Sequence, residues 1–135
     1  MIVLDASVLI AHFDARAALH AEAGRLLRSV ADQQFGISPV TEAEVLVGPA
    51  RSGQLDRAVT ALAQLRVQSV PLGDNGPVRL AMLRAETSLK MPDCCVLLAA
   101  EQSGASQLAT FDDRLCAAAQ ARGFDVLGRS RPAAS

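Results

Sequence analysis

The sequence of 135 residues contains neither tryptophan nor tyrosine, and it has only four phenylalanines. Leucine, valine and alanine must therefore fill the interior, and the abundant alanine favours closely packed helices. There are three cysteines, two of them adjacent at Cys94 and Cys95. This odd number, without the spacing of a zinc site, predicts no disulfide framework. We interpret the cysteines as free thiols of the core and place the protein in the reducing cytoplasm.

Long apolar runs are missing as well. Asp5 interrupts the first apolar run and His12 the second, so we expect no N-terminal signal sequence. No segment approaches the roughly 20 apolar residues of a membrane-spanning helix, so we predict no membrane partner. The net charge is −1, and nucleic-acid binding would therefore need a local patch or a metal ion. Lys90 is the only lysine; arginine binds phosphate well, although GC-rich coding would give the same bias.

Short apolar segments alternate with segments of helical periodicity. Strands are predicted at 1–4, 34–38, 66–72, 106–110 and 125–127, and helices at 6–13, 17–31, 39–47, 55–65, 78–89, 93–103 and 112–122. Gly48-Pro49 is expected to end the third helix. This alternation predicts an α/β fold with a central parallel β-sheet flanked by helices on both faces. The length fits one domain, which we place at 1–128, followed by a polar tail at 129–135.

Acidic residues occur where strands end or helices begin. Asp5 follows the first strand, Asp112 follows the fourth, and Asp93 begins the most apolar helix. Glu42 and Glu44 come shortly after the second strand. In an open parallel sheet these points converge at one edge, where the acids would repel one another unless a cation held them together. Carboxylate oxygens suit Mg²⁺ or Mn²⁺, so the pattern predicts a divalent metal and phosphate chemistry.

Each acid also has a simpler interpretation. Asp5, Asp93 and Asp112 are all placed to cap a helix N-terminus, because aspartate is a favoured capping residue. Glu42 and Glu44 would ordinarily be solvated residues on a helix surface. The evidence for a metal site is therefore the joint placement of the acids and not any one of them.

Other folds that place an aspartate after the first strand fit less well. A haloacid-dehalogenase-type phosphatase needs a second aspartate two residues later, where this chain has Ser7. A response-regulator receiver needs an acidic pair before the phosphoacceptor and a lysine near the last strand, and Lys90 is not there. His12 and His20 lie outside the acidic segments, and we interpret both as helix-surface or hydrogen-bonded side chains without a catalytic role.

Three segments resemble a PIN-domain ribonuclease. They are MIVLDASVLI at 1–10, SPVTEAEVLVGPAR at 38–51 and MPDCCVLLAAEQSGASQLATFDDRL at 91–115. Their order and spacing match across nearly the whole chain, and the arrangement is most similar to the VapC-type toxins of bacterial VapBC toxin–antitoxin pairs. The resemblance implies a metal-dependent endoribonuclease that hydrolyses RNA phosphodiester bonds by metal-activated water. It also implies a homodimer and a cognate antitoxin partner, whose amphipathic segment would lie along an apolar groove and reach the acidic site with a basic side chain.

The resemblance also implies a set of site residues. Asp5, Glu44, Asp93 and Asp112 would hold one or two Mg²⁺ or Mn²⁺ ions, with Ser7 and Thr110 in support. Many relatives have Thr-x-Asn followed shortly by Asp, where this chain has Thr110, Phe111, Asp112 and Asp113. Asp113 therefore remains an alternative to Asp112.

Glu42 remains an alternative to Glu44. Helical periodicity does not separate the two, because each shares a helix face with apolar residues. Glu44 is preferred because its spacing of four residues to Gly48 matches the family. The alternative function is a PIN-like module that binds RNA or a protein without cleaving.

Overall fold

The computed structural model describes residues 1–128. Within them, five short strands form one parallel sheet in the order β3-β2-β1-β4-β5. The strands are β1 (Ile2–Leu4), β2 (Phe35–Ile37), β3 (Val67–Ser69), β4 (Gln107–Ala109) and β5 (Asp125–Leu127). The helices are α1 (Ala6–Phe13), α2 (His20–Ser29), α3 (Pro39–Arg51), α4 (Leu55–Gln64), α5 (Gly76–Thr87), α6 (Met91–Ser103) and α7 (Asp113–Ala121). The predicted fold class is confirmed.

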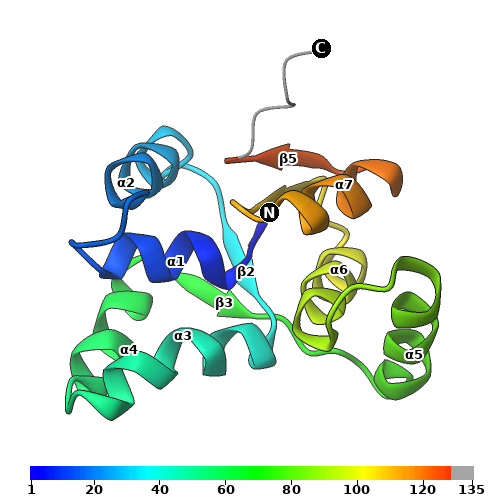
Figure 1. Cartoon of the computed structure of the whole chain (residues 1–135), viewed down its shortest axis with the longest axis horizontal. Coiled ribbons are helices and arrows are strands. Elements are labelled where there is room, and N and C mark those ends of the chain that lie inside the picture. Colours follow the sequence, from blue (N-terminus) through cyan, green and yellow to red (C-terminus); the bar gives the residue numbers. More distant parts are fainter. Residues whose placement is uncertain (129–135) are drawn as a thin grey trace.

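The strand order explains which helices cover which face. The chain adds β2 and β3 on one side of β1, then returns to add β4 and β5 on the other. Because crossovers between parallel strands are right-handed, the change of direction moves the connecting helices to the opposite face. Helices α1 to α4 therefore pack on one face and α5 to α7 on the other, as Figure 1 shows.

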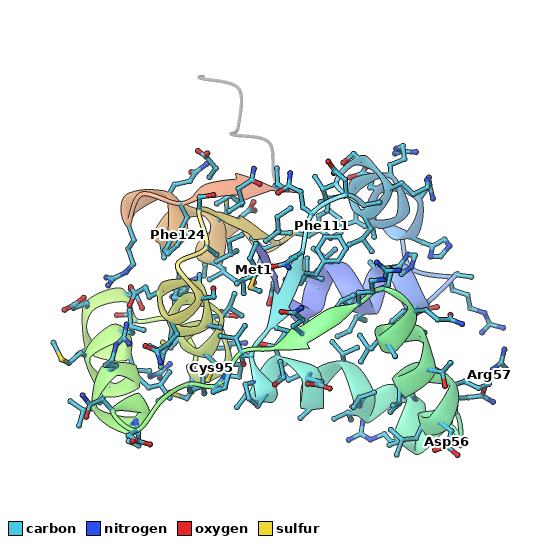
Figure 2. All side chains as sticks on the ribbon, turned by 180° about the vertical axis from the view of Figure 1, so that it is seen from behind. Met1, Asp56, Arg57, Cys95, Phe111 and Phe124 are labelled. Carbon is cyan, nitrogen blue, oxygen red and sulfur yellow. The ribbon has the colours of Figure 1, made fainter. Side chains whose placement is uncertain are left out.

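Two separate hydrophobic clusters fill the space between the sheet and its helices. Ile2 and Leu4 of β1 point into the cluster under α1 to α4, whereas Val3 points into the cluster under α5 to α7. All three are fully buried, as expected for a central strand covered on both faces. Figure 2 shows the same division for the aromatic residues, with Phe111 on the α1–α2 side and Phe124 on the α7 side.

The predicted end of α3 is wrong. Gly48-Pro49 was expected to terminate this helix, but α3 continues to Arg51 with Pro49 inside it. A proline loses one helical hydrogen bond, yet its fixed φ is helical, so a final turn can still form. The Ser52 N–H donates to the Gly48 carbonyl and the Gln54 N–H to the Pro49 carbonyl, which completes that turn.

Several other helices and strands begin or end a few residues away from their predicted positions. Strand β3 is shorter than predicted because its partner β2 offers only three residues and Pro71 has no N–H to donate. Helix α6 begins at Met91, two residues before Asp93. The predicted tail at 129–135 lies outside the described residues. Within residues 1–128, no helix combines the length and hydropathy needed to cross a bilayer.

Candidate active site

The ends of β1 and β4 form the centre of the candidate site. These strands are neighbours in the sheet although they are far apart in the sequence, and Leu4 pairs with Ala109. The Asp5 N–H extends the ladder by donating to the Ala109 carbonyl at 2.9 Å. Connections leave β1 and β4 toward opposite faces of the sheet, and open α/β sheets bind ligands outside the carboxyl ends of the strands at such a point.

The Asp5 carboxylate is held by two hydroxyl groups. Its Oδ2 atom accepts hydrogen bonds from Ser7 Oγ and from Thr110 Oγ1, both at 2.7 Å. Asp5 is only 6% exposed. Although Asp5 occupies the N-cap position of α1, its side chain accepts no capping hydrogen bond. The interpretation of Asp5 as a mere helix cap is therefore wrong, because the carboxylate is oriented by side chains and not by the helix N-terminus.

The same two hydroxyl groups fix the segment that follows β4. Ser7 Oγ accepts from the Phe111 N–H at 3.0 Å, and Thr110 Oγ1 accepts from the Asp112 N–H at 3.0 Å. Each hydroxyl thus donates to Asp5 and accepts from the backbone. Ser7 and Thr110, the predicted supporting residues, thereby connect the Asp5 carboxylate to the backbone of Phe111 and Asp112.

Gly128 closes this region from the β5 side. Its φ of +97° lies in the left-handed region, and a Cβ atom there would stand 2.7 Å from the Thr110 carbonyl oxygen. No flexible side chain could yield to that contact, because the obstructing atom is backbone. Position 128 therefore requires glycine for the end of β5 to approach Thr110.

Asp112 does cap a helix. Its Oδ1 atom accepts from the backbone N–H groups of Arg114 and Leu115 at 2.9 and 3.0 Å, at the start of α7. The capping interpretation is thus correct for this residue. A carboxylate has a second oxygen with further acceptor capacity, so capping through Oδ1 is compatible with a second contact.

Asp93 is not the cap of its helix. Lys90 occupies the N-cap position of α6, and Asp93 is the third helical residue. The pKa of Asp93 is raised to about 6, chiefly by partial burial and then by the negative charges of Asp5, Asp112 and Glu44, in that order of importance. The positive charge of Lys90 acts in the opposite direction. Four acids from four separate segments therefore influence one another electrostatically.

The same interactions bear on the two alternatives that the sequence left open. The pKa of Glu44 is raised, first by partial burial and then by the charge of Asp5. The charges that raise the pKa of Asp93 include those of Glu44 and Asp112, but not those of Glu42 or Asp113. This difference favours Glu44 and Asp112 as site residues.

The donor set suits a hard divalent cation, because it consists of carboxylate oxygens that repel one another. Within residues 1–128, no three His, Cys, Asp or Glu side chains are already close enough together to hold one ion. Mutual repulsion favours side-chain rotamers that keep the carboxylates apart, and a cation would reverse that preference. The chemistry and the placement of the residues therefore fit Mg²⁺ or Mn²⁺.

The histidines and cysteines play no part in this arrangement. His20 Nδ1 is 2.9 Å from the Ala11 carbonyl, and the rings of His12 and His20 stack with centroids 6.4 Å apart. Cys94 and Cys95 are buried in α6, and burial is the main cause of the raised pKa of each thiol. Raised values disfavour the thiolate, which fits the predicted role of core residues. Figure 2 shows Cys95 on α6 within the core.

A groove whose lining residues the sequence did not assign adjoins Glu44. It lies between α1, α3 and α4, has a volume of about 750 Å³ and is lined mainly by apolar residues. Ile10 and Val47 line it and are 47% and 45% exposed, and the charged residues of its lining are Asp14, Glu44 and Arg57. A hydrophobic pattern does not distinguish an exposed valine from a buried one, which is why the residues of the groove could not be assigned from the sequence.

Comparisons with known proteins agree with this geometry. The model of the PIN domain matches residues 2–121. A toxin–antitoxin complex from Klebsiella pneumoniae contains a chain with 28% identity and a TM-score of 0.74, over 87% of this chain and 91% of that one. VapC20 from Mycobacterium tuberculosis, described as a sarcin–ricin-loop-cleaving toxin, has 21% identity and a TM-score of 0.73, over 93% and 97%.

VapBC2 from Rickettsia felis, bound to a DNA fragment from its promoter, has 16% identity and a TM-score of 0.68, over 96% of this chain and 100% of that one. No curated protein gives a significant match. The matched residues 2–121 include every acid of the candidate site. The chain therefore belongs to the PIN-domain family, and its fold is that of the VapC-type toxins of toxin–antitoxin pairs.

Proposed function

We propose that this protein is a metal-dependent endoribonuclease and the toxin of a toxin–antitoxin pair. The observation that carries the proposal is the buried Asp5 carboxylate, which Ser7 and Thr110 orient and whose charge raises the pKa of both Glu44 and Asp93. A buried acid surrounded by other acids destabilises a protein, so its presence favours a ligand that neutralises the charge.

The four acids would hold Mg²⁺ or Mn²⁺. Such an ion, when bound, supplies positive charge for the phosphate oxygens and lowers the pKa of water. Ser7 and Thr110 keep Asp5 in one orientation, because each donates to Oδ2 and is itself fixed by a backbone N–H. Pre-oriented charges of this kind need no rearrangement when charge develops on the phosphate.

The direct test is cleavage of RNA by the purified protein, free of any antitoxin. We expect cleavage with Mg²⁺ or Mn²⁺, none with EDTA and none with Asp5→Asn. Asp56→Asn is the matched control, because Asp56 lies at the outer end of α4, away from the site (Figure 2). Robust cleavage in EDTA would contradict the metal mechanism. RNA binding without cleavage under every metal condition would favour the alternative of a non-cleaving binding module.

The antitoxin partner is supported by the toxin–antitoxin complexes among the structural relatives. We propose that it occupies the groove between α1, α3 and α4. An amphipathic segment fits the apolar wall, and a basic side chain on it would be attracted to Glu44 and Asp14. A partner bound there would lie beside Glu44 and so reach the site.

Co-purification with the protein encoded beside this one tests that assignment. Val47→Asp should abolish or strongly weaken complex formation, because it places a charge on the apolar wall of the groove. Val78→Asp is the matched control, since Val78 is 63% exposed on α5, away from the groove. Equal loss in both variants would contradict the assignment of the groove.

Growth of cells provides the test of the toxin role. Expression of the wild type alone should arrest growth, and expression of Asp5→Ala should not. Healthy growth of cells that contain abundant folded wild-type protein would argue for a housekeeping nuclease or an inactive binder. The homodimer and the cytoplasmic location remain predictions; the molar mass of the purified protein in solution tests the first.

A further inference from the structure

The basic residues on and beside α5, α6 and α7 divide into two groups according to their partners. Arg79 and Arg122 are engaged in ion pairs: both contact Glu101 at 2.8 Å, and Arg122 also contacts Glu86 at 3.2 Å. These contacts join α5, α6 and α7 to one another. Their charge is thus compensated within the protein, so these two arginines contribute little to attraction of a polyanion.

Arg84 and Arg114 make a different kind of contact. Arg84 Nη1 donates to the Leu89 carbonyl at 2.6 Å, and Arg114 Nη2 donates to the Ser88 carbonyl at 3.5 Å. Both guanidinium groups therefore lie at one short turn, Ser88–Lys90, which joins α5 to α6. Backbone carbonyls satisfy donors without cancelling the charge, so each guanidinium keeps its full positive charge at this turn.

The turn itself is held in a defined conformation. Ser88 has a φ of 59°, a left-handed conformation that residues other than glycine adopt only when the surroundings impose it. Thr87 Oγ1 accepts from the Leu89 N–H at 3.2 Å, and the two arginines bind the carbonyls on either side. Because the backbone of the turn is already ordered, it loses little conformational entropy when a ligand binds to it.

The turn leads directly into the candidate active site. Lys90 is the N-cap residue of α6, and Asp93 follows three residues later, so the two side chains leave the same side of the first turn. Arg114 stands in the first turn of α7, two residues after the capping Asp112. Lys90 and Arg114 thus each lie within three residues of a site acid in the sequence, and both side chains are exposed.

A shallow hollow of about 480 Å³ continues from this turn between α5 and α7, and Leu89 and Arg114 line it. On the other side of the site, the groove beside Glu44 is mainly apolar. Arg57 also lines that groove, whereas Lys90 and Arg114, each within three residues of a site acid in the sequence, lie on the α5–α7 side.

We propose that Lys90 and Arg114, on the turn Ser88–Lys90 and the start of α7, bind a backbone phosphate of the RNA that flanks the phosphate to be cleaved. The proposal rests on the proposed ribonuclease function and deepens it by placing the flanking part of the RNA strand on the α5–α7 side of the site. The occupant is a phosphodiester of single-stranded or looped RNA, recognised by charge and not by base. In this role Lys90 and Arg114 are positioning residues.

A competing explanation is that the two cations only balance the charge of the acids. The two explanations differ in what the salt dependence of RNA binding should show. A side chain that contacts a phosphate displaces a counterion, so removing it lowers the slope of log Kd against log salt concentration by about 0.7 for a single strand. A cation that only balances an internal acid displaces none.

The test uses the full chain carrying Asp93→Asn, in EDTA, with a fluorescein-labelled RNA stem–loop and fluorescence anisotropy over a range of KCl concentrations. Lys90→Gln and Arg114→Gln should each weaken binding and lower the salt slope by about 0.7 to 0.9. Lys90→Arg should keep the slope. Arg25→Gln is the matched control, because Arg25 is exposed on α2 on the opposite face of the sheet. Thermal melting of each variant identifies any loss of folding.

Slopes that do not change in Lys90→Gln and Arg114→Gln would overturn the proposal, and so would an equal change in Arg25→Gln. If Arg114→Gln unfolds the protein, the salt slope of Lys90→Gln alone tests the proposal.

Cleavage of RNA with Mn²⁺, by the same variants in the wild-type background, distinguishes failure of the ribonuclease function from failure of the flanking-phosphate site. If the wild type cleaves RNA and KM is unchanged in both variants, the ribonuclease function is supported and the flanking-phosphate site is contradicted. If the wild type binds RNA through these residues but never cleaves it, the phosphate site is supported and the ribonuclease function is contradicted.

Discussion

Thr110 Oγ1 donates a hydrogen bond of 2.7 Å to Asp5 Oδ2, across a sequence separation of 105 residues. The two residues stand at the carboxyl ends of neighbouring strands, β4 and β1, where the strand order reverses direction. Asp5 is thereby fixed by a residue from the opposite end of the chain. The candidate site consequently forms only when the sheet is complete.

Thr110→Val should destabilise the metal-free protein by about 1.5–3 kcal/mol, because it leaves a buried carboxylate without one of its two donors. Thr110→Ser should recover most of that loss, since it restores the hydroxyl. Urea unfolding in EDTA measures the difference. Thr60→Val is the control, because Thr60 is exposed on α4. Equal stability of Thr110→Val and wild type would show that this hydrogen bond makes no net contribution.

Asp112 is expected to serve both as a cap and in the site. Asp112→Asn should keep the helix cap and so alter stability little, yet lower cleavage by about 10²-fold through loss of the charge. Asp112→Ala should cost a further ~1 kcal/mol of stability, because Oδ1 accepts two backbone hydrogen bonds. Asp113→Asn should change cleavage little. Greater loss of cleavage in Asp113→Asn than in Asp112→Asn would reverse the assignment.

Glu44 and Glu42 can be separated in the same way. Glu44→Gln should lower cleavage by about 10²-fold, a usual scale for one lost electrostatic contact in the transition state. Glu42→Gln should have a small effect, since the charges that raise the pKa of Asp93 include that of Glu44 and not that of Glu42. Initial rates on one RNA substrate, with Mn²⁺ at saturation, provide the comparison. The opposite ranking would mean that α3 presents its other acid to the site.

The stability of the metal-free protein should depend on the ionisation of Asp93. Its pKa rises from 3.8 to about 6 on folding, so between those values the folded protein binds more protons than the unfolded chain. Stability from this group is therefore lowest above pH 6 and increases as the pH falls through that value. Asp93→Asn removes this dependence, and in EDTA it should be as stable as the wild type at neutral pH, or more stable.

The measurement is the free energy of unfolding of wild type minus that of Asp93→Asn, at neutral pH and at about pH 5 in EDTA. The difference should move in favour of the wild type at the lower pH. His12, whose pKa is lowered mainly by burial, makes folding less favourable as the pH falls, but it is present in both proteins and cancels. A difference that stays constant with pH would show that Asp93 is not under electrostatic strain.

Metal should stabilise the folded protein, because an ion that binds only the folded state raises stability by mass action. The melting temperature of the wild type should rise with millimolar Mn²⁺ and return to its starting value with EDTA. Asp93→Asn should lose most of that response. A wild-type melting temperature that is indifferent to Mn²⁺ would count heavily against a metal site.

The sequence by itself determined the class of fold and the approximate position of every described element. The bounds of α1 and β5 agree with the prediction, because short apolar runs and helical periodicity are local properties of the chain. It also determined that acids stand at the ends of strands and the starts of helices. Where it failed, as at the end of α3, one helical hydrogen bond lost at Pro49 was too small a penalty to stop the helix.

Only the tertiary structure decided what those acids do. The sequence treated Asp5, Asp93 and Asp112 alike as possible caps, yet only Asp112 accepts capping hydrogen bonds. The structure likewise favours Glu44 over Glu42 and brings Lys90 and Arg114 to the border of the site. These distinctions depend on contacts between residues far apart in the chain, and the strand order β3-β2-β1-β4-β5 creates those contacts. Local patterns carry no information about them, because the order of the strands is settled by packing over the whole sheet.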